Sequence, residues 1–147
     1  MLARSGPALL LALSICAAQD APKLSLRERA AKGDPQAEFN LAKTYEAGRG
    51  GLKKDYTEAE RWYRRAAQQG DPFAQASLGI LFRFGKGVAQ DYVEAYQWFY
   101  LAASRTTGSD QESILELRNS TAAHMTPEQI EEASRRAREW KPEPLAK

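Results

Sequence analysis

The sequence predicts an all-α fold, a right-handed α-solenoid of helix–turn–helix repeats. Two observations lead to this prediction: one block of residues occurs twice in register, and apolar residues recur at helical spacing inside each block. The 147 residues have room for one domain, and an apolar fraction of 43% with 27% charged residues is ordinary for a globular protein. The expected segments are a signal peptide (1–18), a linker with a capping helix (19–32), a first repeat (33–69), a second repeat (70–104), a degenerate third helix pair (105–141) and a flexible tail (142–147).

The repeat is visible as paired positions along the chain. Gly33-Asp34-Pro35 returns 37 residues later as Gly70-Asp71-Pro72. One extra residue in the first loop then shortens the offset to 36, which carries Trp62 to Trp98. Other pairs are Ala37 with Ala74, Leu41 with Leu78, Tyr45 with Phe82, Gly48 with Gly85, Gly50 with Gly87, and Asp55-Tyr56 with Asp91-Tyr92. A register kept over this many positions indicates stacked structural units.

Each unit has the start and stop signals of two helices. Asp34 and Asp71 are predicted N-caps, each followed by a proline at the first helical position, where no amide donor is needed. Gly48 and Gly85 are predicted to end these helices in the left-handed conformation. The second helices are expected to open at Asp55 and Asp91, with an acidic capping box completed by Glu58 and Glu94. Trp62 and Trp98 are expected to fill the core between small alanines.

The motif Ala-x-x-x-Leu-(Ala/Gly)-x-x-(Tyr/Phe)-x-x-Gly-x-Gly, followed by Asp-Tyr-x-Glu-Ala-x-x-Trp-(Tyr/Phe)-x-x-Ala-Ala, resembles the Sel-one-like repeat, a relative of the tetratricopeptide repeat. The resemblance covers residues 33–103. It departs from the family pattern at Gly51, where the second unit has the usual Val88, and at Ala42, where the second unit has Gly79. The resemblance implies a solenoid that binds other proteins, usually through the surface of the first helices.

Two units cannot bury their own outer faces, so elements that cap both ends are expected. Residues 24–31 resemble the tail of a second helix. After a linker at 105–108, a helix is expected over about 110–123, and Thr126-Pro127-Glu128-Gln129 is a capping box that opens another. This last pair lacks the Gly-x-Gly loop and is interpreted as a degenerate third repeat.

The first 18 residues have the layout of a secretory signal peptide. Arg4 precedes an apolar run over 8–15, which is too short to span a bilayer, and small residues lead to Ala18, the predicted last residue before cleavage. Lipid attachment at Cys16, the only cysteine, is an alternative, although Ile15 stands where a small residue is expected. A third interpretation is a disordered or buried N-terminus. The predicted location is therefore periplasmic or secreted.

Composition gives little support for catalysis or for binding nucleic acid. The net charge is +2 with interleaved signs, and His124 is the only histidine, expected as a surface or capping residue. Each Gly-x-Gly loop follows a helix, whereas a phosphate-binding loop would follow a strand. No catalytic residue, metal ligand, cofactor or membrane span is predicted.

The two repeats differ on the surface of their first helices. Phe73, Ser77, Ile80 and Phe84 form a stripe in the second unit at positions where the first unit has Gln36, Asn40, Lys43 and Ala47. One interpretation is a partner-binding groove, whose candidate residues are Asn40, Lys43, Phe73, Ser77, Ile80 and Phe84. The other is packing against Ile114, Leu115 and Leu117, an interpretation favoured for Tyr96 and Tyr100 and left open for the Phe73 stripe.

These patterns predict an exported, monomeric, non-catalytic scaffold that binds a protein or peptide. The alternative is an envelope enzyme, because a cysteine-rich branch of the resembled family is reported to bind or hydrolyse β-lactams. In that branch each unit contains a disulfide bond, whereas no cysteine follows Cys16 in this sequence.

Overall fold

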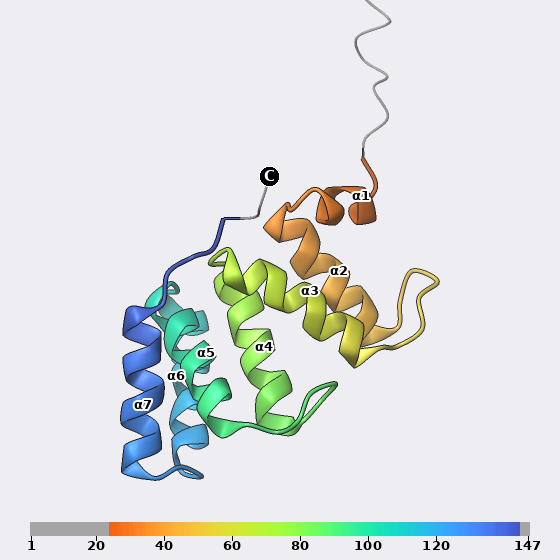
Figure 1. The fold of residues 1–147 in the computed structure, drawn as a ribbon. Coiled ribbons are helices and arrows are strands. Elements are labelled where there is room, and N and C mark those ends of the chain that lie inside the picture. The colour runs from red at the N-terminus through yellow and green to blue at the C-terminus, as the bar shows by residue number, and fades with distance from the viewer. Residues whose placement is uncertain (1–23, 145–147) are drawn as a thin grey trace, which may run out of the picture.

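The structure, a computed structural model, describes residues 24–144, so the predicted signal peptide (1–18) lies outside the described residues. Within that range the chain is all α-helical, as predicted, and successive helices stack side by side into an α-solenoid (Figure 1). The helices are α1 (Leu26–Ala31), α2 (Pro35–Ala47), α3 (Tyr56–Gln68), α4 (Pro72–Phe84), α5 (Tyr92–Ser104), α6 (Gly108–Ala122) and α7 (Pro127–Glu139).

The two repeats form the pairs α2–α3 and α4–α5, and α3 also packs against α4. The predicted caps of the first helices are confirmed. The Asp34 carboxylate accepts hydrogen bonds from the amides of Gln36 and Ala37, and Asp71 accepts one from Ala74. Gly48 and Gly85 end α2 and α4 with φ values of 65° and 62°, in the left-handed region that glycine adopts without a Cβ clash.

The acidic capping boxes predicted for α3 and α5 are only half formed. The Asp55 carboxylate accepts hydrogen bonds from the amides of Thr57 and Glu58, which caps α3 in one direction. The return bond to the Glu58 carboxylate is not made, because the amide of Asp55 donates to the carbonyl oxygen of Tyr45 at 3.0 Å instead. The reciprocal box predicted at the start of α7 is present, between Thr126 and Gln129.

The core lies between the helix pairs, and the two tryptophans do not contribute to it equally. Trp98 is 5% exposed, as predicted, whereas Trp62 is only partly buried between two apolar clusters. The guanidinium groups of Arg61 and Arg65 lie 5.9 Å and 5.0 Å from its ring. Trp62 therefore packs against the apolar core, as predicted, but it is buried less completely than Trp98. The neighbouring Tyr63, 1% exposed, fills the core of the first repeat more completely.

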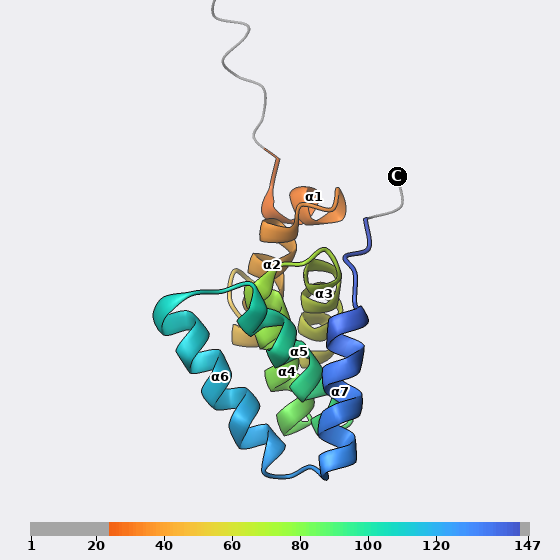
Figure 2. The ribbon, with the colours of Figure 1, turned by 90° about the vertical axis from the view of Figure 1, so that its left-hand side faces the viewer.

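The C-terminal pair differs from the two full repeats in its packing. Helices α6 and α7 both pack against α5 and make few contacts with each other. Figure 2 shows them diverging from their connecting loop with α5 between them. Helix α6 begins at Gly108, two residues before the expected Asp110. The pair thus closes the solenoid by flanking α5 and does not stack as a third repeat.

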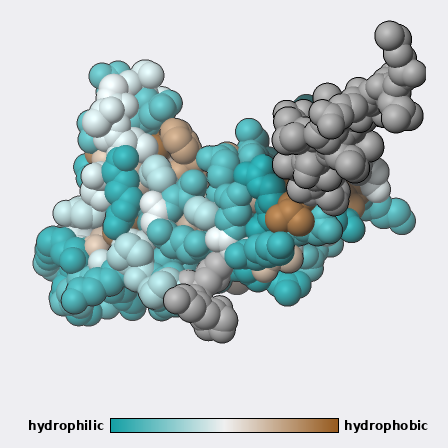
Figure 3. Space-filling view, turned by 90° about the horizontal axis from the view of Figure 1, so that it is seen from above, coloured by the Kyte–Doolittle hydropathy of each residue, from teal (hydrophilic) through white to brown (hydrophobic). Residues whose placement is uncertain are grey.

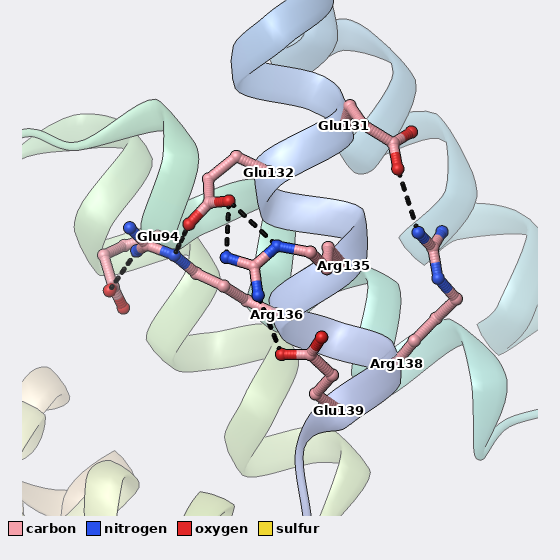
Figure 4. Close-up of polar contacts among 7 residues, drawn as sticks. All are labelled: Glu94, Glu131, Glu132, Arg135, Arg136, Arg138 and Glu139. Atoms are coloured by element: carbon pink, nitrogen blue, oxygen red, sulfur yellow. Dashed lines mark hydrogen bonds and ion pairs between the residues drawn. The ribbon is translucent and has the colours of Figure 1, made fainter.

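The outer face of α7 is charged and its ions are paired (Figure 4). Arg135 donates hydrogen bonds to Glu132 and Glu139, and Arg136 bonds Glu132 and approaches Glu94 of α5 at 3.8 Å. The charges on this helix are thus paired with one another on a solvent-exposed face. Exposed pairs of this kind stabilise a fold little, but they make the face a poor apolar docking surface.

Candidate partner-binding surface

The six predicted binding residues lie on the first helices of the two repeats. Asn40 and Lys43 are exposed on α2. The other four, Phe73, Ser77, Ile80 and Phe84, follow one another along α4 and are called the α4 face below. Phe73 and Phe84 are 46% and 55% exposed, whereas Ser77 and Ile80 are half-buried. Large apolar side chains at both ends of this face are therefore open to solvent.

The structure separates the two interpretations of the aromatic residues added in the second unit. Tyr96 is buried and Tyr100 half-buried on α5, and the Arg118 guanidinium of α6 lies 5.8 Å and 5.9 Å from their rings. The favoured packing interpretation is thus confirmed for the tyrosines. Ile80 also packs against the core. Phe73 and Phe84 stay exposed, which leaves them for another role.

The two polar candidates line a separate cleft on α2. This α2 cleft has a volume of about 460 Å³ and is lined by Asn40, Lys43, Thr44, Glu46, Ala47 and Arg49. Phe39 connects it to the α4 face. The Lys43 ammonium lies 5.5 Å from the centre of the Phe39 ring, and that ring lies 6.4 Å from the ring of Phe73. The contact between Phe39 and Phe73 therefore joins the α2 cleft of the first repeat to the α4 face of the second.

A partly buried hydrogen bond joins α2 to α3 beside this contact. The Tyr63 hydroxyl donates a 2.6 Å hydrogen bond to the Glu46 carboxylate, and its ring lies 5.8 Å from Phe39. Burial and the Glu46 carboxylate raise the pKa of Tyr63, which keeps the hydroxyl protonated as a donor. Phe39, Glu46 and Tyr63 are not among the binding residues predicted from the sequence. The helical spacing of Phe39, Lys43 and Glu46, at i, i+4 and i+7, was the available signal.

Cations surround the exposed aromatic at the other end of the α4 face. Arg83 and Lys86 place their charged groups 5.2 Å and 5.9 Å from the centre of the Phe84 ring. With Lys43 they give the surface a positive border. Apolar anchors bordered by cations suit a partner segment that carries apolar and acidic side chains.

The described residues hold neither a candidate metal cluster nor a candidate membrane span. Within residues 24–144 no cluster of three or more His, Cys, Asp or Glu side chains is placed to hold a metal ion. His124 is exposed, as expected, and stacks on Tyr92 with 4.7 Å between ring centres. None of the helices in this range is long and apolar enough to cross a membrane. Figure 3 shows a largely hydrophilic face with small, separate apolar patches.

Comparison with known sequences identifies the family of the two repeats. The pattern of the Sel1 repeat matches residues 35–71 and 72–106. The chitin synthase regulator SKT5 of Saccharomyces cerevisiae is 36% identical over 93 residues, which cover 63% of this chain and 13% of that protein. The Arabidopsis thaliana ERAD-associated E3 ubiquitin-protein ligase component HRD3B is 40% identical over 57 residues, or 38% of this chain and 9% of that protein. The chain thus spans a small part of the curated relatives it matches.

Two solved structures are similar to this chain in both fold and sequence. The protective antigen c5321 of uropathogenic Escherichia coli, which displays an SLR fold, aligns with a TM-score of 0.71 at 36% identity, over 78% of this chain and 24% of that one. A Sel1 repeat protein from Oxalobacter formigenes aligns with a TM-score of 0.52 at 30% identity, over 78% of this chain and 96% of that one. The repeat register, the helix pairs and these alignments agree, and the chain belongs to the Sel1-repeat family.

Proposed function

We propose that the chain is an exported, non-catalytic scaffold that binds a protein partner across the α4 face and the adjoining α2 cleft. The observation that carries this proposal is the exposure of Phe73 and Phe84 at the two ends of one helix face. Large aromatics left open on an otherwise hydrophilic surface mark interaction sites, because their burial by a partner supplies much of the binding free energy.

The chemistry of the surface favours a segment with bulky apolar and acidic residues. Lys43 borders the surface at the α2 cleft, and Arg83 with Lys86 borders it at Phe84. Apolar side chains of the partner would cover Phe73 and Phe84, and its carboxylates would meet the cations. The Asn40 side chain, exposed beside Lys43, offers both a donor and an acceptor to a partner backbone.

The relatives support a role in protein association. One is described as a regulator of chitin synthase, and another as a component of an E3 ubiquitin ligase. Both descriptions belong to proteins that work with other proteins. We infer that the two repeats of this chain serve the same general purpose, with a partner set by the residues on α2 and α4.

The experiment combines site-specific crosslinking with binding measurements. A photo-crosslinking residue at Phe84 should capture the partner in cells, and the same residue at Arg135 on the charged α7 face is the control. With the captured partner, Phe84→Ala should weaken binding about thirtyfold, because aromatic anchors contribute about 2 kcal/mol or more. Lys43→Ala should mainly slow association and flatten its salt dependence. Unchanged affinity in both Phe73→Ala and Phe84→Ala would place binding elsewhere.

Export is the second part of the proposal and rests on the sequence of residues 1–18. The apolar run and the small residues before Gln19 have the layout of a cleaved signal peptide. Expression of the full chain with a C-terminal tag in a Gram-negative host should give an envelope or medium fraction whose intact mass begins at Gln19. Cys16→Ser should leave that mass unchanged. Recovery of a lipidated Cys16, or of the uncut chain in the cytoplasm, would contradict cleavage after Ala18.

A further inference from the structure

Among residues 24–144, the N-terminal end of the solenoid leaves part of α2 uncovered. In the second repeat, α4 is flanked by the preceding helix α3, which has 13 residues, whereas α2 is preceded by α1, which has only six. Beside α1 lies a cleft of about 650 Å³, called the N-terminal cleft below. It is lined by Ser25, Leu26, Arg27, Leu41, Thr44, Arg49, Gly50, Gly51 and Leu52.

The second repeat shows what covers the equivalent surface there. A Cβ added to Gly87 would lie 2.5 Å from the carbonyl carbon of Tyr56, so the first turn of α3 rests directly on that glycine. The Lys86 ammonium lies 5.5 Å from the centre of the Tyr56 ring, and Leu81 beneath is fully buried. Figure 1 shows the loop between α4 and α5 reaching toward α3. The occupant of this surface is therefore the start of a helix with an aromatic residue in its first turn.

The first repeat has an equivalent surface around Gly50, but no helix among residues 24–144 covers it as α3 covers Gly87. By the offset of 37, Gly50 corresponds to Gly87, Arg49 to Lys86 and Thr44 to Leu81. A Cβ on Gly50 would meet only the Thr44 methyl group, at 3.5 Å, and a Cβ on Gly51 would meet nothing within 4 Å. The glycine and the cation before it are retained, Thr44 takes the place of Leu81, and Leu26, Leu41 and Leu52 supply an apolar lining. Only the helix that would rest on them is missing from the described part of the chain.

Residues 19–25, which precede α1, do not match this occupant. In the register of the repeat, the helix start Tyr56–Trp62 corresponds to residues 19–25, which contain no aromatic residue and include Pro22, unsuited to a helix interior. A second copy is also a poor occupant. The outer face of its α7 is charged, and two N-terminal clefts placed face to face would oppose Arg27 and Arg49 of each copy.

We propose that the N-terminal cleft binds the first two turns of a helix from a different protein, seated as α3 is seated on the second repeat. The partner helix has an acidic N-cap and an aromatic residue at its first position. The aromatic ring lies under the Arg49 guanidinium, and the partner backbone rests on Gly50. Arg27 and Arg49 favour the acidic first turn. This site is separate from the α4 face, so the two proposals stand or fall independently.

The test uses a probe copied from the occupant seen in the second repeat. A helix-stabilised peptide with the sequence of Lys54–Trp62 is added to isotope-labelled full-length protein, and binding is followed by NMR chemical shifts. We expect shifts centred on Gly50, Gly51 and Leu52. The same peptide with Tyr56→Ala should bind at least about tenfold more weakly, because the buried ring is lost.

Matched protein variants locate the contact. Arg49→Glu should weaken peptide binding about threefold or more, through loss of the cation over the ring. Lys141→Glu, the same change of charge at an exposed residue at the other end of the solenoid, should leave peptide binding unchanged. Absence of shifts at about 2 mM peptide, which corresponds to less than about 4 kcal/mol of binding, would overturn the proposal. So would equal binding of the Tyr56→Ala peptide, or shifts centred on Phe73 and Phe84.

Discussion

The ring of Phe99 occupies the space where a side chain of Gly79 would lie. A Cβ built on Gly79 would be 2.7 Å from the nearest carbon of that ring, and Phe99 is fully buried. In the first repeat the equivalent positions hold Ala42 and Tyr63, which are both buried in the same apolar cluster. Each repeat therefore combines a small residue on its first helix with an aromatic on its second, and the second repeat uses the tighter combination.

This contact predicts that Gly79→Ala destabilises the protein. An alanine in the interior of α4 would normally gain up to about 1 kcal/mol in helix propensity. The overlap with Phe99 should outweigh that gain, because crowding a close-packed core costs about 1–3 kcal/mol. Urea melts of Gly79→Ala, Phe99→Leu and the double variant would measure the coupling between the two sites. A Gly79→Ala variant as stable as the wild type would show that the ring moves aside freely.

The two repeat tryptophans should differ in their contribution to stability. Trp98→Ala should lower the free energy of unfolding by about 3–5 kcal/mol, because it leaves a cavity in the core. Trp62→Ala should cost clearly less, because Trp62 is only partly buried and two arginines cover its ring. Thermal and urea unfolding of both variants, side by side, tests this difference. Equal losses would mean that Trp62 is as much a core residue as Trp98.

The equivalent caps Asp34 and Asp71 should respond to pH in opposite directions. The hydrogen bond from Arg29 and the amide of Ala37 lower the pKa of Asp34, whereas burial raises the pKa of Asp71. Asp71 has no equivalent of the Arg29 hydrogen bond, because the corresponding position in the second repeat is Ala66. Asp34 therefore stabilises the fold above its ordinary pKa of about 4, and this contribution is lost as pH falls. The contribution of Asp71 is present below that pKa and is lost as pH rises through the raised value.

Urea unfolding of the wild type, Asp34→Asn and Asp71→Asn between about pH 3 and pH 6 tests this contrast. The stability of the wild type relative to Asp34→Asn should increase with pH across this window. Relative to Asp71→Asn it should decrease. Slopes of the same sign for the two variants would contradict the opposite pKa shifts.

The exposed phenylalanines of the α4 face should contribute little to folding. Phe84→Ala and Phe73→Ala should each change the free energy of unfolding by less than about 1 kcal/mol, because roughly half of each side chain is already exposed. Ile80→Ala, on the same face but packed against the core, should cost more and serves as the comparison. A loss near that of Ile80→Ala for Phe84→Ala would make Phe84 a structural residue.

Much of the fold can be predicted from local sequence signals. The cap residues, the glycines after α2 and α4 and the doubled register predict the helices and their pairing, because each signal acts within a few residues of its effect. The candidate residues on α4 were found in the same way, since Phe73, Ser77, Ile80 and Phe84 share one helical face. Their exposure could not be predicted, because the packing alternative also placed apolar residues of the C-terminal pair within reach.

The tertiary structure decided which chemically similar residues are buried. Trp62 and Tyr63 are adjacent and both aromatic, yet only Tyr63 fills the core, because the side chain of Trp62 lies between two clusters under Arg61 and Arg65.

The same holds for the C-terminal pair and for the N-terminal cleft. Spacing predicted two further helices, but only packing shows that α6 and α7 flank α5. The sequence repeats Gly50 as Gly87, and only the three-dimensional arrangement shows that one is covered by Tyr56 and the other is open. Local sequence signals determine where a helix begins and ends within a few residues. Burial of a side chain depends instead on which segments, distant in sequence, pack around it.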